Sequence, residues 1–366
     1  MLGEILKELE PCTDLPSYFR SCVNLFQKHR PAANQVYRTS IEPPPGWTYR
    51  GATLEQFQRV WDSLGLLAFA HIRAAVQCQY SENDPRKLIL WKRSDILAFL
   101  SETSGEQSAT QVALESMIYC RELSPPDISL QPFVEINAEW IVASPWMVAT
   151  SNFSRNFFAL IARRDSTAWD STSDIFADHM GHQLSNWIND LGYRATTQVK
   201  ITDNNGNAMT DLDLVVWSPK EHFVITAELK WMIQVADLME VLNRGEKECH
   251  RKLQEQLPKH RHALTSNSNG IINRAFGEQA NVNTHDSLLV CQGFGGTPRL
   301  PSEFPCVDER VFRLAIEHSS TLREAMEWLR SRDWLPRVRE HFRVNDMTIR
   351  TVTGIQLTFP EPEFPS

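Results

Sequence analysis

Two strand-like segments separated by a short polar turn constrain this 366-residue chain more than any other feature. Residues 211–217 (DLDLVVW) and 223–230 (FVITAELK) are rich in the β-branched and aromatic residues that favour strands. The five residues between them, SPKEH, are typical of a turn. The pattern predicts an antiparallel hairpin whose centre lies between Lys220 and Glu221.

This hairpin places four charged residues on one face. Its register sets Asp213 directly opposite Glu228 and Asp211 opposite Lys230. Residues i and i+2 of a strand point to the same side, and directly opposed residues have Cβ atoms about 5 Å apart. We therefore expect the four charged side chains to form one cluster. The residues that alternate with them on the second strand are expected to face a core: Ile225, Ala227 and Leu229.

The residue types in this cluster suit metal-assisted chemistry on phosphates. Two carboxylates as close as Asp213 and Glu228 repel each other unless a positive charge lies between them. Carboxylate oxygens suit Mg²⁺ or Mn²⁺, which keep most of their waters and accept substrate phosphates. A lysine beside them, here Lys230, can orient or activate a water or stabilise charge on a phosphate.

The pattern resembles the PD-(D/E)xK nuclease superfamily, whose members carry an Asp on one strand and E-x-K or D-x-K on the next. Asp213, Glu228 and Lys230 match those positions. The resemblance implies an α/β (α+β) fold with a restriction-endonuclease-like core, which runs helix, three antiparallel strands, helix, strand. It also implies a Mg²⁺- or Mn²⁺-dependent endonuclease that cleaves phosphodiester bonds, with DNA favoured over RNA, in a defence or repair system by analogy. In that case Asp213, Glu228 and the Leu229 backbone carbonyl bind the metal, and Lys230 orients the attacking water.

The flanking segments can be compared with this order of elements. Apolar residues recur with a 3.6-residue period in 176–191, and the pattern stops at Gly192. The remaining segments predict a strand, a turn, a helix and a short apolar strand, in that order: 196–202, 203–207, 237–257 and 287–291. The order of elements matches the superfamily core.

Two positions depart from the superfamily pattern. Many members carry a Glu on the first core helix that reaches the metal; here Asp178 is the acid that could substitute for it. Many members also carry Q-x-x-x-Y on the helix after the lysine strand, where this chain has Gln256 and His260. Gln256 is therefore a candidate substrate or active-site contact, although an ordinary exposed helix glutamine fits equally well. Pro258 is expected to end or kink this helix because proline lacks an N–H donor.

Several alternatives stay open. The charged cluster fits a solvated hairpin face with cross-strand ion pairs. It also fits a non-catalytic scaffold or nucleic-acid-binding protein with a nuclease-like fold, which the two departures favour. His179 and His182 have the spacing of two zinc ligands, but no third ligand or general base is evident. The sequence contains no G-x-S-x-G nucleophile motif and no Walker A motif. It therefore gives no support for acyl transfer on an α/β-hydrolase fold or for nucleotide hydrolysis.

Pattern and composition suggest three parts. Residues 1–165 are expected to form a mainly helical accessory or targeting region able to bind a protein partner, residues 166–295 the nuclease-like core, and residues 296–366 an extension packed on the core. The predicted elements outside the core are helices at 54–79, 86–103 and 322–335, a loop at 292–298, a strand within 348–359 and an irregular tail at 359–366.

The net charge and the cysteine usage limit the possible functions further. A net charge of −8 argues against a surface that binds nucleic acid throughout. Locally, residues 244–262 carry six Lys or Arg against three Glu, which suits a phosphate backbone or a solvated amphipathic helix. Seven scattered cysteines without a C-x-x-C pair indicate a reducing compartment and argue against a zinc ribbon. The longest apolar run, 64–76, is too short to span a bilayer, and the N-terminus lacks a secretory signal, so we expect a cytoplasmic protein without membrane contact.

Overall fold

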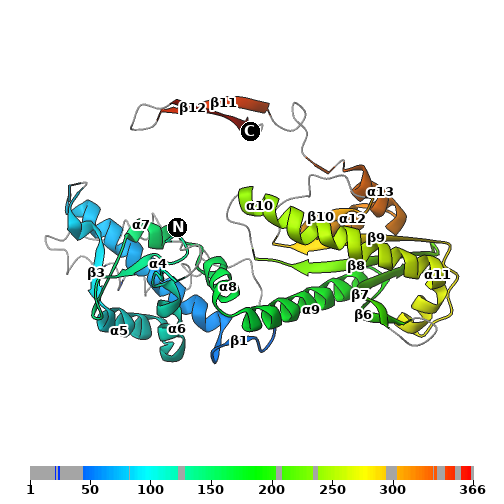
Figure 1. The fold of residues 1–366 in the computed structure, drawn as a ribbon, viewed down its shortest axis with the longest axis horizontal. Helices are drawn as coiled ribbons and strands as arrows, with labels where there is room; N and C mark the ends of the chain where they lie inside the picture. The colour runs from blue at the N-terminus through cyan, green and yellow to red at the C-terminus, as the bar shows by residue number, and fades with distance from the viewer. Residues whose placement is uncertain are drawn as a thin grey trace. The chain divides into compact units, whose positions relative to one another are not determined.

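The chain has a mixed α/β structure in two compact units, Met1–Phe176 and Ala177–Ser366. The division lies inside one long helix, α9 (Ser166–Asp190). Figure 1 shows the elements of the computed structural model. The residues it describes are 21, 24, 44–81, 83–122, 128–202, 208–233, 238–293, 303–332, 334–335, 343–350 and 356–363.

The first unit combines helices with two small sheets. Aromatic rings dominate its packing, with the Phe57 and Phe157 centroids 4.5 Å apart and Trp61 against both. One sheet pairs β1 with β2, and the other has the order β3-β5-β4. The elements in chain order are β1 (Thr48–Tyr49), β2 (Ala52–Thr53), α4 (Leu54–Gln77), the 3₁₀ turn η2 (Pro85–Lys87), β3 (Ile89–Lys92), α5 (Arg93–Ser104), α6 (Gln107–Met117), β4 (Phe133–Glu135), β5 (Trp140–Ala143), α7 (Pro145–Thr150) and α8 (Phe153–Arg164).

One helix prediction in this unit is confirmed and another is wrong in its first part. Helix α4 follows the predicted 54–79 segment to Gln77 and begins at Thr53, where a capping box with Gln56 satisfies two backbone N–H groups. The predicted helix 86–103 instead starts with η2 and β3, and only α5 is helical. Residues 89–92 form a strand because they pair with β5, and the alternation of a strand buries Ile89 and leaves Leu90 exposed. This tertiary pairing overrides the helical propensity of the segment.

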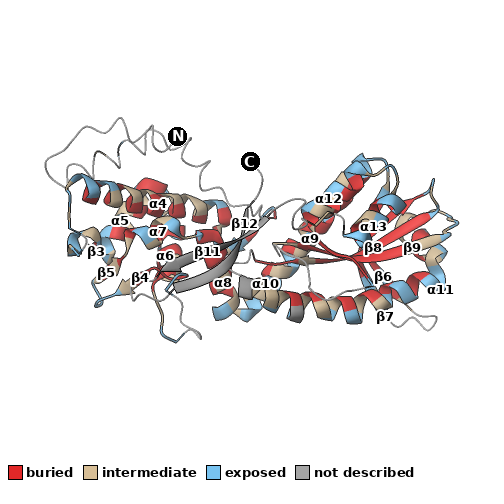
Figure 2. Cartoon of the chain, turned by 90° about the horizontal axis from the view of Figure 1, so that it is seen from above, coloured by how far each residue is buried: buried red, intermediate tan, exposed pale blue. Residues whose placement is uncertain are grey.

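A five-stranded mixed sheet organises the second unit. Its order is β10-β9-β8-β7-β6, with β6, β7 and β8 antiparallel in succession and β9 and β10 parallel to β8. In Figure 2 the middle strand β8 is coloured almost entirely as buried, and its neighbour β9 is buried from Asp286 to Cys291. The strands are β6 (Arg194–Thr202), β7 (Ala208–Ser218), β8 (Phe223–Trp231), β9 (Thr284–Gln292) and β10 (Cys306–Asp308).

Helices cover both faces of this sheet. Helix α9, α12 (Glu309–His318) and α13 (Leu322–Ser331) pack on the face that carries Ile225, Ala227 and Leu229, as the alternation of β8 predicts. On the other face, α11 (Leu257–Phe276) packs against strand residues that include Val215 and Val224. The predicted helices 176–191 and 322–335 correspond to α9 and α13. The second ends earlier than predicted, where Arg332 adopts a left-handed conformation with φ 59°.

A long helical segment between β8 and β9 contains two π-helical stretches. The chain is helical from α10 (Leu238–Arg244) through the π-helical η3 (Gly245–Cys249) and η4 (Lys252–Gln256) into α11. Of the two outcomes predicted for Pro258, an end or a kink, the helix does not end there, because α11 continues to Phe276. The hydrogen-bond pattern changes from π to α at Leu257, and the non-helical residue of α11 is Asn267. Short π-helical stretches often occur at functional sites.

The described C-terminal strands form a separate two-stranded sheet, β11 (Arg343–Arg350) with β12 (Gln356–Glu363). The tail predicted to be irregular from Phe359 is therefore a strand as far as Glu363. Pro360 and Pro362 are two residues apart, so both lack an N–H group on the same edge of β12. A two-stranded sheet has an outer edge that forms no ladder, and proline is tolerated there. The predicted turn 203–207 and most of the predicted loop 292–298 lie outside the described residues. No helix in the described residues is long and apolar enough to cross a membrane.

Candidate active site

The β7–β8 hairpin has the predicted register. Leu214 pairs with Ala227 and Trp217 with Val224, so the next opposed pair is Asp213 and Glu228. The turn between the strands contains His222 in a left-handed conformation with φ 50°. Because β8 is a central strand, this register brings both carboxylates into the interior of the sheet face that η4 and α11 cover.

Asp213 lies at the point where the ladder between the two strands ends. Its Oδ2 accepts a hydrogen bond from the Leu229 N–H at 2.8 Å, so its side chain replaces a backbone acceptor. Burial raises the pKa of Asp213 to about 6, and the nearby charge of Glu228 adds to the increase. The hydrogen bond from Leu229 opposes both effects but does not outweigh them.

Glu228 is 5% exposed and has two cationic or basic neighbours. The Lys252 ammonium contacts its Oε1, and His260 Nε2 lies 3.4 Å from its Oε2. Burial favours the protonated form of Glu228, but the polar contact with His260 and the charge of Lys252 outweigh burial and lower its pKa. Two carboxylates in one site therefore differ in their tendency to ionise.

Lys230 lies one full strand period beyond Glu228 and is partly exposed. Its Nζ is 3.2 Å from Glu248 Oε2 on η3. Asp211 is exposed and opposes Lys200 of β6. Of the predicted cluster of four charged residues, Asp213 and Glu228 form the inner pair, while Asp211 opposes Lys200 and Lys230 forms its ion pair with the helix above the sheet.

The other two predicted site residues have no contact with the carboxylate pair. Asp178 on α9 is exposed and accepts a hydrogen bond from the Gln198 side chain at 2.6 Å. The core contacts of α9 lie on the sheet face opposite Glu228. Gln256 ends η4 in a half-buried position between Lys252 and His260 in the sequence, without a hydrogen bond to either carboxylate.

Lys252 and His260 are the site residues that the sequence did not assign to Glu228. Lys252 was part of a basic segment expected to face phosphate, and His260 was noted only where many superfamily members carry Tyr. A π-helical stretch lies between them, so a helical period gives no signal that would link them to one partner. The ring of His260 is fully buried; its Nε2 faces Glu228 Oε2, and its Nδ1 has no hydrogen-bond partner among the described residues.

The donor set fits a hard divalent cation. Asp213 and Glu228 supply two adjacent carboxylates, and Mg²⁺ uses one or two carboxylates together with waters and substrate phosphates. Burial, and after it the charge of Glu228, raises the pKa of Asp213, and a cation bound at the pair would favour its ionised form. Lys252 supplies the positive charge at Glu228, and His260 Nε2 faces its other oxygen.

Comparisons of this chain with protein-family models, with curated proteins and with solved structures found no match. The residues of the site and their geometry are therefore the basis for a functional proposal.

Proposed function

We propose that this chain is a metal-dependent nuclease that hydrolyses phosphodiester bonds of nucleic acid, DNA rather than RNA. The observation that carries the proposal is the hairpin register, which sets Asp213 beside Glu228 with Lys230 two residues further along the same strand. The succession of α9, β6 to β8, α11 and β9 is also the order of the restriction-endonuclease-like core. That order supports membership of the PD-(D/E)xK superfamily.

Each residue has a role in this proposal. Asp213, Glu228 and the Leu229 carbonyl would hold Mg²⁺ or Mn²⁺, which when bound lowers the pKa of a water and stabilises charge on the phosphate. Lys230 would turn from Glu248 to the attacking water and orient it by a hydrogen bond. Asp213 would change from its partly protonated state to the ionised state, because a nearby positive charge favours the carboxylate.

Lys252 is the side-chain cation that contacts Glu228, and this contact must break before a metal can bind Glu228. A lysine released in this way would lie next to the bound phosphate and could neutralise part of its charge. His260, fully buried and close to Oε2, would keep Glu228 in position during this exchange.

The test is cleavage of linear double-stranded DNA, single-stranded DNA and RNA by the full chain with Mg²⁺ or Mn²⁺. We expect Asp213→Asn and Lys230→Ala to abolish cleavage while the circular dichroism spectrum stays that of the unmodified protein and neither variant unfolds at a lower temperature. Lys200→Ala, which removes an exposed lysine from the adjacent strand β6, is the matched control and should cleave normally. Cleavage that persists in EDTA or in the Lys230→Ala protein would disprove the mechanism.

A second candidate function is a non-catalytic scaffold or nucleic-acid-binding protein with the same fold. The contacts of Lys252 and His260 with the two oxygens of Glu228 favour it, because they compensate this carboxylate without a metal. Calorimetric titration with Mn²⁺ separates the two functions. Uptake that disappears in Asp213→Asn and Glu228→Gln supports the nuclease, and absence of such uptake supports the scaffold.

A further inference from the structure

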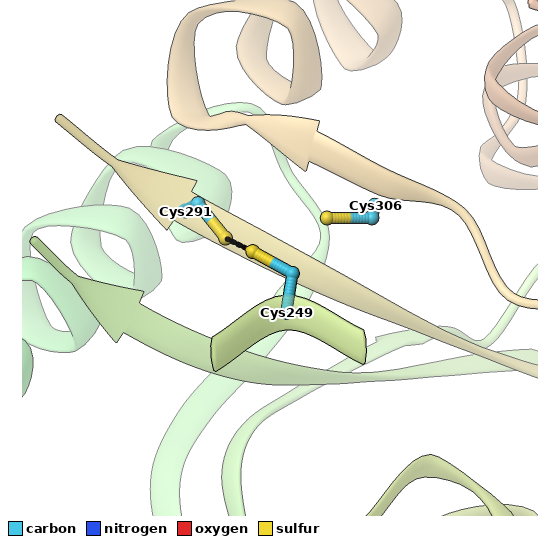
Figure 3. A group of neighbouring side chains, drawn as sticks. All are labelled: Cys249, Cys291 and Cys306. Atoms are coloured by element: carbon cyan, nitrogen blue, oxygen red, sulfur yellow. Dashed lines mark hydrogen bonds between the residues drawn. The ribbon is translucent and has the colours of Figure 1, made fainter. Parts of the chain in front are cut away.

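Three cysteines that are far apart in the sequence converge in the second unit (Figure 3). Cys249 lies on η3, Cys291 on β9 and Cys306 on β10. Their three sulfur atoms all lie within 4.8 Å of one another. All three are buried free thiols, and Cys249 Sγ lies 3.9 Å from Cys291 Sγ, a hydrogen-bond distance and far longer than a disulfide bond.

Strand pairing explains why two of these thiols share a face. Cys306 pairs with Leu289 in the parallel β9–β10 register, and Leu289 is two residues from Cys291. Residues two apart on a strand point the same way, so Cys306 and Cys291 both face the helical segment that carries Cys249. Figure 3 shows the three sulfurs directed toward a common centre from three different elements.

The surroundings of the thiols are apolar. The same buried cluster contains Met232, Leu253, Leu257, Leu289 and Phe304. In the described residues, no His, Asp or Glu joins the three sulfurs as a close potential ligand. The site therefore offers only soft sulfur donors, which select Zn²⁺, Cu(I) or related thiophilic ions over Mg²⁺.

Ordinary packing explains the cluster less well than metal binding does. A buried free cysteine usually behaves as a small hydrophobic residue. Three polarisable sulfurs around one point bring three weak donors together, whereas core packing has no need to place them side by side.

We propose that Cys249, Cys291 and Cys306 form a trithiolate site for a soft closed-shell metal ion, Zn²⁺ or Cu(I). Each thiol that binds the ion releases its proton to solvent as the sulfur–metal bond forms. Three thiolates can complete the coordination of Cu(I), whereas Zn²⁺ would take a fourth ligand such as water. No change of oxidation state is involved.

Such a site would fasten η3 to the two parallel strands at the edge of the sheet. Cys249 follows Glu248, the ion-pair partner of Lys230, and Cys291 is the register partner of Lys230 on β9. A bound ion would therefore fix the helix above Lys230. The proposed site is independent of the proposed nuclease activity and is tested by metal binding alone.

The experiment uses the full chain, purified with reduced thiols under anaerobic conditions. Zn²⁺ uptake is measured by competition with a chromogenic chelator, and Cu(I) uptake by competition with a copper(I)-specific chromophore. We expect one equivalent of one of these ions per chain, lost in Cys249→Ser and in Cys291→Ser. Cys78→Ser changes a half-buried cysteine of the first unit and should bind as the unmodified protein does. Competition with chelators of known affinity gives the dissociation constant of the site for each ion.

X-ray absorption of the loaded, unmodified protein keeps the test decisive even when a variant fails to fold. Three sulfur neighbours, at about 2.3 Å for Zn²⁺, are the expected result. A first shell dominated by nitrogen and oxygen would overturn the proposal. Uptake of neither ion by the unmodified protein, or equal uptake by a folded Cys291→Ser protein, would overturn it as well.

Discussion

Asp213 and Glu228 are neighbours in the sheet, yet their surroundings favour different protonation states. Asp213 has one backbone donor and a negatively charged neighbour, and its pKa rises to about 6. Glu228 contacts Lys252 and His260, and its pKa falls. Near and below pH 6, where Asp213 is partly protonated, a cation that binds this pair displaces the proton, so metal binding and proton release should be coupled there.

The first prediction at the residue scale concerns stability and pH in the absence of metal. The pKa of Asp213 rises from 3.8 to about 6 on folding, so its contribution to stability is present below pH 4 and lost as the pH rises toward 6. Asp213→Asn stays neutral and retains an acceptor for Leu229. The free energy of unfolding of this variant, relative to the unmodified protein, should therefore increase by up to about 3 kcal/mol between pH 4 and pH 7.5.

Urea denaturation at the two pH values measures this difference. Asp211→Asn, an exposed position on the same strand, is the control and should show little change with pH. An Asp213→Asn difference that is equal at both pH values would rule out the electrostatic description of the pair.

The sequence predicts the Asp213–Glu228 pair but misses its partners. Strand alternation and the turn set the register, because the side-chain period of two leaves little freedom once both strands are recognised. Lys252 and His260 come from a helical segment with a π-helical stretch between them. A π-helical stretch shifts the direction of every later side chain, so a 3.6-residue period cannot give the contacts of that segment.

At the scale of elements, the strand and helix order was predictable and the boundaries were less so. Strands β6 to β9 and helices α9 and α13 follow from their apolar periods. Strand β3 was missed because its pairing partner β5 lies about fifty residues away in the sequence. The cysteine cluster was missed for the same reason, since η3, β9 and β10 bring together thiols that have no recognisable spacing.

Helix α9 gives a prediction at this scale, because it packs closely on the sheet through Gly181. A Cβ atom at Gly181 would lie 3.2 Å from Leu229 Cδ1 and 3.3 Å from Thr197 Cγ2. Gly181→Leu gains helix propensity but overfills this contact, so we expect a net loss of about 1–3 kcal/mol in the free energy of unfolding. Asn186→Leu, at an exposed position of the same helix, is the control and should not destabilise the protein. Equal denaturation midpoints for the two variants would show that α9 does not approach the sheet so closely.

At the scale of the whole molecule, net charge limits how this protein can hold nucleic acid. With a net charge of −8, contact with phosphates must be local. The helical segment above the site carries three exposed cations that have no carboxylate partner among the described residues: Lys247, Arg251 and Lys259. Other basic residues of this segment are already paired, Lys252 with Glu228 and Arg261 with Glu303.

This distribution predicts a shallow salt dependence of DNA binding. Three phosphate contacts give a slope of about −3 in a plot of log K against log salt concentration. Replacing Lys247, Arg251 and Lys259 by Gln should remove most of this slope, as measured by fluorescence anisotropy with Ca²⁺ in place of Mg²⁺. Replacing three exposed arginines of the first unit, Arg73, Arg121 and Arg164, by Gln should leave it unchanged. The opposite result would place the nucleic-acid surface elsewhere.

The carboxylate pair as a metal site is the central claim, and a crystal structure of the full chain soaked with Mn²⁺ tests it most directly. We predict an anomalous difference peak between the carboxylates of Asp213 and Glu228, with the Lys252 ammonium moved away from Glu228. A map without a peak at these carboxylates, in which Lys252 still contacts Glu228, would contradict the claim.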